Sequence, residues 1–344
     1  MNKKRLYKIF LVIIAVLAIS PWIFTDQSAA KVQAYYSGDA IYYNNQLLVA
    51  TTNTGYLEIF KLQGQDLLTL VKVKVYNPRF NNYDDYSDVK MTIEGGQLYI
   101  YTASKYTLLK YNFSDLRNLS LIAEKKNNSW NWYYRVDRFG NNMGIVGTHG
   151  VDILNSDSEI INSYAFSPEE PFGLRSNGSN NLLFAINDDK IQIYNRETRK
   201  IDTEIPLNFS SQEVNHKIYF DAITDNIYAI DDYYAKKFSL DGKLLASFRH
   251  LDYPGYEMES STGNPYVYFS NGTGVVKMNK ESFTVNDFAY TSNLDGSGGW
   301  AMGLKLVNTD KGDRLVVFNS ASIIVLNDQL DKLASVPATE EARQ

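Results

Sequence analysis

The sequence repeats one strand-turn-strand pattern seven times, and this repetition restricts the folds open to the chain more than any other feature. In one copy Leu182, Phe184 and Ile186 alternate with their neighbours, residues 187–189 supply turn chemistry, and a second β-prone run ends at Tyr194. The other six copies begin at Gln46, Gln97, Asn142, Asn226, Tyr266 and Arg314. The pattern predicts two adjacent antiparallel strands in every copy.

Each copy can be aligned on the bulky residue that ends its second run. These alignment residues are Phe60, Tyr111, Leu154, Tyr194, Phe238, Met278 and Leu326. Their spacings of 40 to 51 residues are close to the roughly 40 to 50 residues of a four-stranded propeller blade. The next residue is Asn or Ser in six copies, with Lys61 as the exception, which predicts a tight turn after this run.

The spacing leaves room for two further strands in each repeat, which predicts an all-β chain of seven four-stranded antiparallel blades. Innermost strands are expected at residues 39–43, 89–93, 133–137, 173–176, 217–222, 257–261 and 301–307. Outer strands are expected at residues 67–75, 119–124, 160–166, 201–207, 244–249, 285–290 and 332–336. We expect the β-prone segment 32–36 to pair with the last blade and close the ring, because an open ring leaves an exposed strand edge.

The repeats resemble those of seven-bladed β-propellers related to WD40, quinoprotein-like and YVTN-type repeats. The resemblance spans residues 32–337 and is strongest in AKKFSLDGKLLASF from Ala235. No repeat ends in Trp-Asp, so the resemblance identifies an architecture and no member family. Propellers of this class include enzymes as well as binding scaffolds, and the fold does not choose between them.

The first 30 residues read as an export signal. Lys3, Lys4, Arg5 and Lys8 precede an apolar run over residues 9–24, and such a positive flank stays in the cytoplasm while the following chain is exported. Small residues at 28–30 suit cleavage by a signal peptidase, and a retained inner-membrane signal anchor is the alternative. We therefore expect an extracytoplasmic propeller over residues 31–337, in the periplasm or at the cell surface, and a disordered tail over residues 338–344.

Composition excludes several kinds of site. The chain has no cysteine, so it forms neither disulfides nor thiolate metal sites. Its formal charge of −5 becomes −8 without the four leader cations and Asp26, which argues against nucleic-acid binding because that requires a basic surface. We expect no cofactor and no metal. The three histidines are far apart and no nucleophile motif occurs, so the sequence predicts no catalytic residue and favours a chain that is not an enzyme.

Two sets of side chains are candidates for binding. The first is aromatic and lies in or next to the connections between blades. It comprises Tyr83, Tyr86, Trp130, Trp132, Tyr256 and Trp300. Such rings offer large apolar contact with a polar group attached, which suits binding of a protein or stacking on a sugar. The alternative is that they pack between blades.

The second set is charged and belongs to the innermost strands. It comprises Lys90, Arg135, Arg175, Lys217, Glu257 and Lys305. If these side chains face the channel, they form a mainly basic ring that attracts an anion. The alternative is a solvated channel with ion pairs to Glu257 and Asp137.

These features favour an extracytoplasmic binding or scaffold module for an envelope or surface protein. The main alternative is a hydrolase or lyase, acting for example on carbohydrate, or a sensor of an anionic ligand, with its site in the channel. A rigid membrane-tethered spacer is a third possibility, in which the membrane is contacted through the N-terminal segment alone.

Overall fold

The computed structural model of the chain describes residues 37–53, 56–74, 86–104, 107–126, 133–139, 142–147, 150–165, 173–176, 182–186, 190–195, 198, 200–207, 218–231, 233–250, 255–295 and 299–337. The expected leader, the segment 32–36 and the tail 338–344 lie outside these residues. No helix within the described ranges has both the length and the apolar character needed to cross a membrane.

These residues form 28 strands and the five-residue helix α2 (Thr291–Asp295). The strands fall into seven groups of four that are consecutive in the sequence. Group 1 is β1 (Ser37–Tyr43), β2 (Gln46–Asn53), β3 (Tyr56–Gln63) and β4 (Asp66–Lys74); group 2 is β5 (Tyr86–Glu94), β6 (Gln97–Ser104), β7 (Thr107–Asn112) and β8 (Ser120–Lys126). Group 3 is β9 (Tyr133–Phe139), β10 (Asn142–Gly147), β11 (Gly150–Leu154) and β12 (Ile160–Ala165); group 4 is β13 (Gly173–Ser176), β14 (Leu182–Ile186), β15 (Lys190–Asn195) and β16 (Lys200–Pro206). Group 5 is β17 (Ile218–Asp221), β18 (Asn226–Ile230), β19 (Tyr234–Ser239) and β20 (Leu244–Arg249); group 6 is β21 (Gly255–Glu259), β22 (Tyr266–Asn271), β23 (Gly274–Asn279) and β24 (Val285–Tyr290); group 7 is β25 (Ala301–Thr309), β26 (Gly312–Asn319), β27 (Ser322–Asn327) and β28 (Lys332–Pro337).

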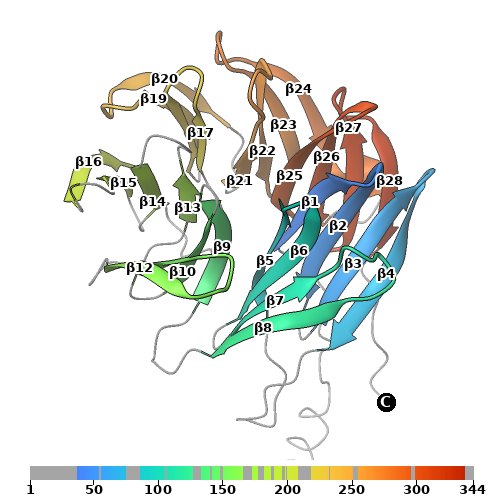
Figure 1. Ribbon diagram of the computed structural model, residues 1–344. Helices are drawn as coiled ribbons and strands as arrows, with labels where there is room; N and C mark the ends of the chain where they lie inside the picture. Colours follow the sequence, from blue (N-terminus) through green and yellow to red (C-terminus); the bar gives the residue numbers. More distant parts are fainter. Residues whose placement is uncertain are drawn as a thin grey trace, which may run out of the picture. The chain divides into compact units, whose positions relative to one another are not determined.

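Each group is an antiparallel meander in which every strand pairs with the next in sequence. Groups 2 to 6 form separate four-stranded sheets, whereas groups 1 and 7 share one eight-stranded sheet. The two halves of that sheet are joined by a single parallel pairing of β4 with β28, Asp66 opposite Ser335. In Figure 1 the blue strands β1–β4 accordingly lie beside the red strands β25–β28.

A β-bulge recurs at one position in all seven groups. The pairing of the third strand with the fourth shifts register immediately before each alignment residue: Phe60, Tyr111, Leu154, Tyr194, Phe238, Met278 and Leu326. A bulge bends a strand and increases its twist, so the same distortion at the same place makes the groups structurally equivalent. The alignment derived from the sequence is confirmed by this shared feature.

The groups follow one another in a propeller-like ring. The first strand of every group contacts the first strand of the next, from β1 and β5 through to β21 and β25, and β25 contacts β1. The all-β expectation and the four-stranded repeating unit are therefore confirmed. The helix expected at the N-terminus lies outside the described residues, as does the strand expected to close the ring; the observed junction is the contact of group 7 with group 1.

Buried apolar side chains fill the space between neighbouring groups. Leu48 and Ala50 of β2 belong to a cluster shared with group 2, whereas Leu47 and Val49 of the same strand belong to a cluster shared with group 7. Because successive strand residues point to opposite faces, both faces of β2 are covered. For this reason the sequences of the second strands are nearly continuous apolar runs.

Candidate functional site

Two layers of charge on the innermost strands

The pairing registers place seven innermost-strand residues at equivalent positions. In each group the third-strand residue just before the bulge pairs with one residue of the second strand. That second-strand residue in turn pairs with one residue of the first strand. These first-strand residues, which we name the first layer, are Asp39, Lys90, Asp137, Arg175, Tyr219, Glu259 and Lys305. Their charges alternate around the ring, interrupted only at Tyr219.

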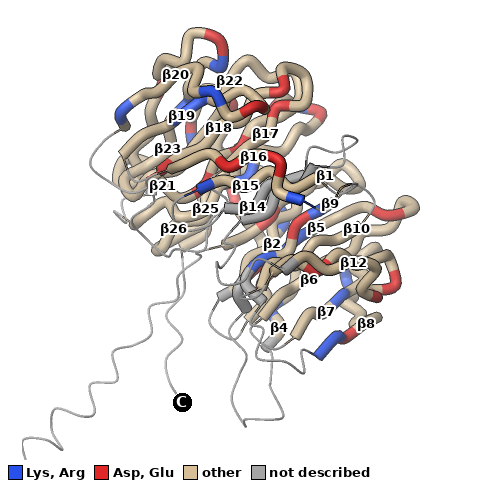
Figure 2. The backbone as a smooth tube through the Cα atoms, turned by 90° about the vertical axis from the view of Figure 1, so that its left-hand side faces the viewer, with Lys and Arg blue, Asp and Glu red and all other residues tan. Residues whose placement is uncertain are grey.

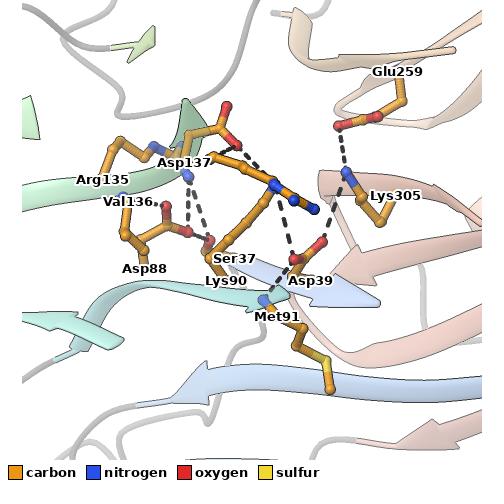
Figure 3. A network of polar contacts seen from close by, with 11 residues as sticks. Ser37, Asp39, Asp88, Lys90, Met91, Arg135, Val136, Asp137, Glu259 and Lys305 are labelled. Carbon is orange, nitrogen blue, oxygen red and sulfur yellow. Dashed lines mark hydrogen bonds and ion pairs between the residues drawn. The ribbon is translucent and has the colours of Figure 1, made fainter. Parts of the chain in front are cut away.

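Five first-layer residues form a continuous chain of ion pairs across groups 3, 2, 1, 7 and 6 (Figure 3). The ammonium of Lys90 lies 2.8 Å from Oδ1 of Asp137 and 3.9 Å from Oδ2 of Asp39. The ammonium of Lys305 lies 3.7 Å from Oδ1 of Asp39 and 3.4 Å from Oε1 of Glu259. The carboxylate of Asp39 is thus held between two cations from neighbouring groups.

Tyr219, the neutral member of the first layer, belongs to group 5. Its pKa is raised to about 12 because burial and the nearby carboxylate of Asp221 disfavour the phenolate. At physiological pH the phenol therefore stays protonated and adds no charge to the layer.

A second layer lies two residues earlier in each strand, and therefore on the same strand face. Its described and charged members include Asp88, Arg135 and Glu257, all at most 5% exposed. Oδ1 of Asp88 accepts hydrogen bonds from the Ser37 hydroxyl at 2.6 Å and from Nη1 of Arg135 at 3.4 Å. Such partners offset part of the cost of burying charge.

Both layers also bind backbone of the next group. Oδ2 of Asp39 accepts the N–H of Met91 at 2.8 Å, and Oδ2 of Asp88 accepts the N–H of Val136 at 3.0 Å. In each case a carboxylate on one innermost strand takes up a donor of the following innermost strand (Figure 3). The same arrangement joins group 1 to group 2 and group 2 to group 3.

The predicted charged set divides between these layers. Lys90 and Lys305 lie in the first layer, and Arg135 and Glu257 lie in the second. Arg175 takes a first-layer position on β13, but its side chain is outside the described atoms. Lys217 is also outside the described residues.

The described cations of the two layers are accompanied by carboxylates. The described part of the two layers is therefore not mainly basic. Lys90 pairs with Asp137, as the alternative interpretation expected. More widely, Figure 2 shows acidic and basic residues interspersed over the described backbone. Asp39 and Asp88 were not predicted as site residues from the sequence. Alignment of the innermost strands on the seven alignment residues nevertheless places Asp39 in the same position as Lys90.

An anchored tryptophan between groups 6 and 7

The aromatic set is only partly described. Tyr83, Trp130 and Trp132 lie outside the described residues, and Tyr86 begins β5 with no described side chain. Tyr256 is 1% exposed and Trp300 is 46% exposed. Of these two predicted contact residues, only Trp300 presents a large surface to solvent.

Trp300 is held in place from two directions. Its backbone N–H donates to the Ser320 hydroxyl at 2.9 Å, and its carbonyl accepts the N–H of Ser320 at 2.9 Å. The ring centroids of Tyr256 and Trp300 are 6.4 Å apart with planes inclined by 52°. Buried Tyr256 therefore packs beside the exposed ring of Trp300.

Histidines and carboxylates are the remaining candidates for metal binding or catalysis. No three His, Asp or Glu side chains among the described residues come together as metal ligands. His250 is buried, with Nε2 2.9 Å from the carbonyl oxygen of Asp231. His149 and His216 are outside the described residues. The charged layers thus show how carboxylates and cations join the groups. They do not identify a catalysed reaction.

No protein-family model matches this sequence, and comparison with curated proteins gives no significant match.

Proposed function

We propose that the chain is a seven-bladed propeller that acts outside the cytoplasm as a binding or scaffold module for an envelope or surface protein. The blade number is supported by the seven equivalent bulges and by the unbroken sequence of contacts from β1 to β25 and back to β1. Export is supported by the positive and apolar segments of residues 1–24.

The observation that carries the binding proposal is the rigid exposure of Trp300. Exposed aromatic side chains that are fixed before binding lose little conformational freedom on association, and Trp is enriched among residues that dominate interface energies. The hydrogen bonds to Ser320 hold the backbone of Trp300, and the contact with Tyr256 restricts its ring.

Topology places Trp300 at an edge suited to a contact surface. In an antiparallel meander, the turn from the second to the third strand lies at the same edge as the connection to the next group. We name this the connection edge. Trp300 lies in the connection from β24 to β25, and Ser320 lies in the turn from β26 to β27, so both belong to it. Loops gathered at one edge of a rigid scaffold are common places for binding residues.

The proposal is tested by capture of partners from intact cells that produce the tagged whole chain, followed by chemical cross-linking and quantitative mass spectrometry. The Trp300→Ala variant is compared with the wild type and with Ile122→Ala. Ile122 is a matched control because it is 51% exposed on the outer strand β8.

We expect one envelope or surface protein to be recovered by the wild type and by Ile122→Ala, and to be reduced at least about tenfold by Trp300→Ala, since hot-spot truncations cost about 2 kcal/mol or more. Equal recovery of this partner by the wild type and by both variants would overturn the contact at Trp300 and favour a role as a spacer. The N-terminal peptide of the captured chain reports whether the leader is cleaved.

A further inference from the structure

A pocket of ≈ 390 Å³ opens where group 7 meets group 1. Its lining comes from the turns between β1 and β2, β3 and β4, and β25 and β26, together with the start of β28. These turns lie at the edge opposite Trp300. The pocket is therefore separate from the proposed protein-binding surface, and it spans the one junction between groups that are not consecutive in the sequence.

Three other junctions carry a lysine that the junction of group 7 with group 1 lacks. In groups 2, 5 and 6 the residue before the bulge is a lysine whose ammonium donates to a carbonyl in the β-turn of the next group. The donor and acceptor residues are Lys110 and Ser156, Lys237 and Lys280, and Lys277 and Asp328.

The junction of group 7 with group 1 has no lysine before the bulge, as is also true of groups 1, 3 and 4, where Ile59, Ile153 and Ile193 take this position. Val325 replaces the lysine, and the residue at the place of the accepting turn carbonyl is Leu62. Leu62 lines the pocket. An apolar side chain thus takes the place of the lysine of groups 2, 5 and 6, and Leu62 adds apolar lining to the pocket.

The pocket is also positively charged in an acidic protein. Lys311, Arg314 and Lys332 line it, with Asp310 as the single acidic lining residue. Within the described part of the chain none of these three cations forms an ion pair, in contrast to Lys72, Lys90 and the other paired lysines. The three positive charges are thus available to a ligand.

Two contacts hold the polar side of the pocket in shape. Arg314 donates from Nη1 to the carbonyl of Asp313 at 2.8 Å and from Nη2 to that of Lys311 at 2.9 Å. Asp310 lies beside the Tyr42 phenol and raises the pKa of that phenol. Arg314 is therefore oriented before any ligand arrives.

We propose that this pocket binds a small organic anion whose charged group faces Lys311, Arg314 and Lys332 and whose apolar body lies against Leu47, Leu62 and Leu333. Arginine and lysine recognise carboxylate and phosphate through charge-assisted hydrogen bonds. The combination of an apolar wall with a few convergent polar groups is typical of small-molecule sites. Because the ligand contacts groups 1 and 7 together, its binding stabilises the closed ring.

The neighbouring pocket of ≈ 490 Å³ between groups 6 and 7 provides an internal contrast. It is lined by Asp313, Asp328 and Lys277, and the Lys277 ammonium is already bonded to the Asp328 carbonyl. Its lining carries more negative than positive charge. Of these two pockets, the one at the junction of groups 7 and 1 is therefore the one suited to an anion.

The test uses isothermal titration calorimetry and thermal denaturation of the purified whole chain with three probes. Benzoate and phenyl phosphate are the two anions, and benzamide is the neutral analogue of similar shape. For ligands of about ten heavy atoms at roughly 0.3 to 0.5 kcal/mol per atom, we expect a Kd of about 1 mM. The probes are therefore titrated to about 20 mM.

The variant Lys311→Gln/Lys332→Gln neutralises two exposed pocket lysines, and Lys200→Gln/Lys243→Gln is the matched control in groups 4 and 5. We expect at least one anion to bind and to raise the Tm, benzamide to bind at least about tenfold more weakly, and the pocket variant alone to weaken anion binding by about tenfold. Whether benzoate or phenyl phosphate binds more tightly identifies the preferred anionic group. Equal binding of benzamide, an undiminished affinity in the pocket variant, or no binding of either anion up to about 20 mM would overturn the proposal. None of these results depends on Trp300.

Discussion

Asp88 offers the sharpest test of the account of the innermost strands. Its carboxylate accepts hydrogen bonds from Ser37, from Arg135 and from the backbone N–H of Val136. Asp88 and Arg135 are each 2% exposed, and Val136 is 0% exposed. Asp88→Ala therefore takes the facing anion from a buried guanidinium and removes the acceptor of a buried N–H.

The expected cost follows from these two losses. Removing one member of a buried ion pair costs about 3–5 kcal/mol, and depriving a buried N–H of its acceptor costs about 1–3 kcal/mol. The losses share one site and do not add fully, so we expect Asp88→Ala to lower the free energy of unfolding by about 4 kcal/mol. This is a large part of the roughly 5–15 kcal/mol typical of a domain.

The assay is equilibrium denaturation in guanidinium chloride followed by tryptophan fluorescence. Asp88→Ala is compared with Asp88→Ala/Arg135→Met, in which an apolar side chain replaces the buried cation, and with Glu124→Ala. Glu124 is a matched control because its pair with Lys126, 3.4 Å apart, is exposed and is worth about 0–1 kcal/mol. We expect the double variant to be more stable than Asp88→Ala alone. A loss below about 1 kcal/mol in Asp88→Ala, or a double variant no more stable than Asp88→Ala, would refute this account.

Three further predictions follow from packing and charge. Gly38→Ala would place a Cβ in steric overlap with the ring of Phe318 in group 7, so we expect it to lower the free energy of unfolding by about 1–3 kcal/mol through overpacking. In denaturation, Phe318→Leu should restore part of this stability, and the absence of recovery would contradict the contact. Lys110→Met removes the hydrogen bonds of the ammonium to Glu94 at 3.0 Å and to the Ser156 carbonyl at 2.6 Å. We expect the free energy of unfolding to fall by about 1–3 kcal/mol in the same assay. An unchanged stability would show that this contact between groups 2 and 3 contributes little. Burial raises the pKa of Tyr219, Tyr228 and Tyr268 to about 12, while unfolded tyrosine titrates near pH ~10. The stabilisation from these three phenols is therefore complete below pH ~10 and is lost as the pH rises towards ~12. Calorimetry should show a Tm that falls over this range, whereas exposed phenols would leave the Tm unchanged.

Strand positions were largely predictable because the repeat records them seven times. The outer strand expected at residues 244–249 is β20 (Leu244–Arg249), and the innermost strand expected at residues 173–176 is β13 (Gly173–Ser176). Period-two apolar patterning and turn residues carry this information locally. The repeat spacing then indicates how many such units the chain contains.

The partners of the charged residues could not be predicted in the same way. Lys90 was recognised as an innermost-strand cation, but its bond to Asp137 joins group 2 to group 3 and depends on how neighbouring sheets are rotated. The alternation of charge appears only after the bulges fix the register. Tyr256 was expected at a contact surface, but its buried position under Trp300 depends on the packing of group 6 against group 7, which local sequence does not encode.

The claim on which the closed ring and the anion pocket depend is that group 7 meets group 1. The double variant Asp66→Cys/Ser335→Cys tests it most directly, because these residues are paired on β4 and β28 and the natural chain has no cysteine. Paired strand residues lie about 5 Å apart, within the roughly 4.4–6.8 Å that a disulfide spans between Cα atoms. The control variant is Ile161→Cys/Ser335→Cys, in which one of the two cysteines is moved to β12 of group 3. Mild oxidation followed by non-reducing electrophoresis and mass spectrometry should show nearly complete intramolecular cross-linking of the test variant and none of the control. Cross-linking of the test variant no greater than that of the control would contradict the closed arrangement.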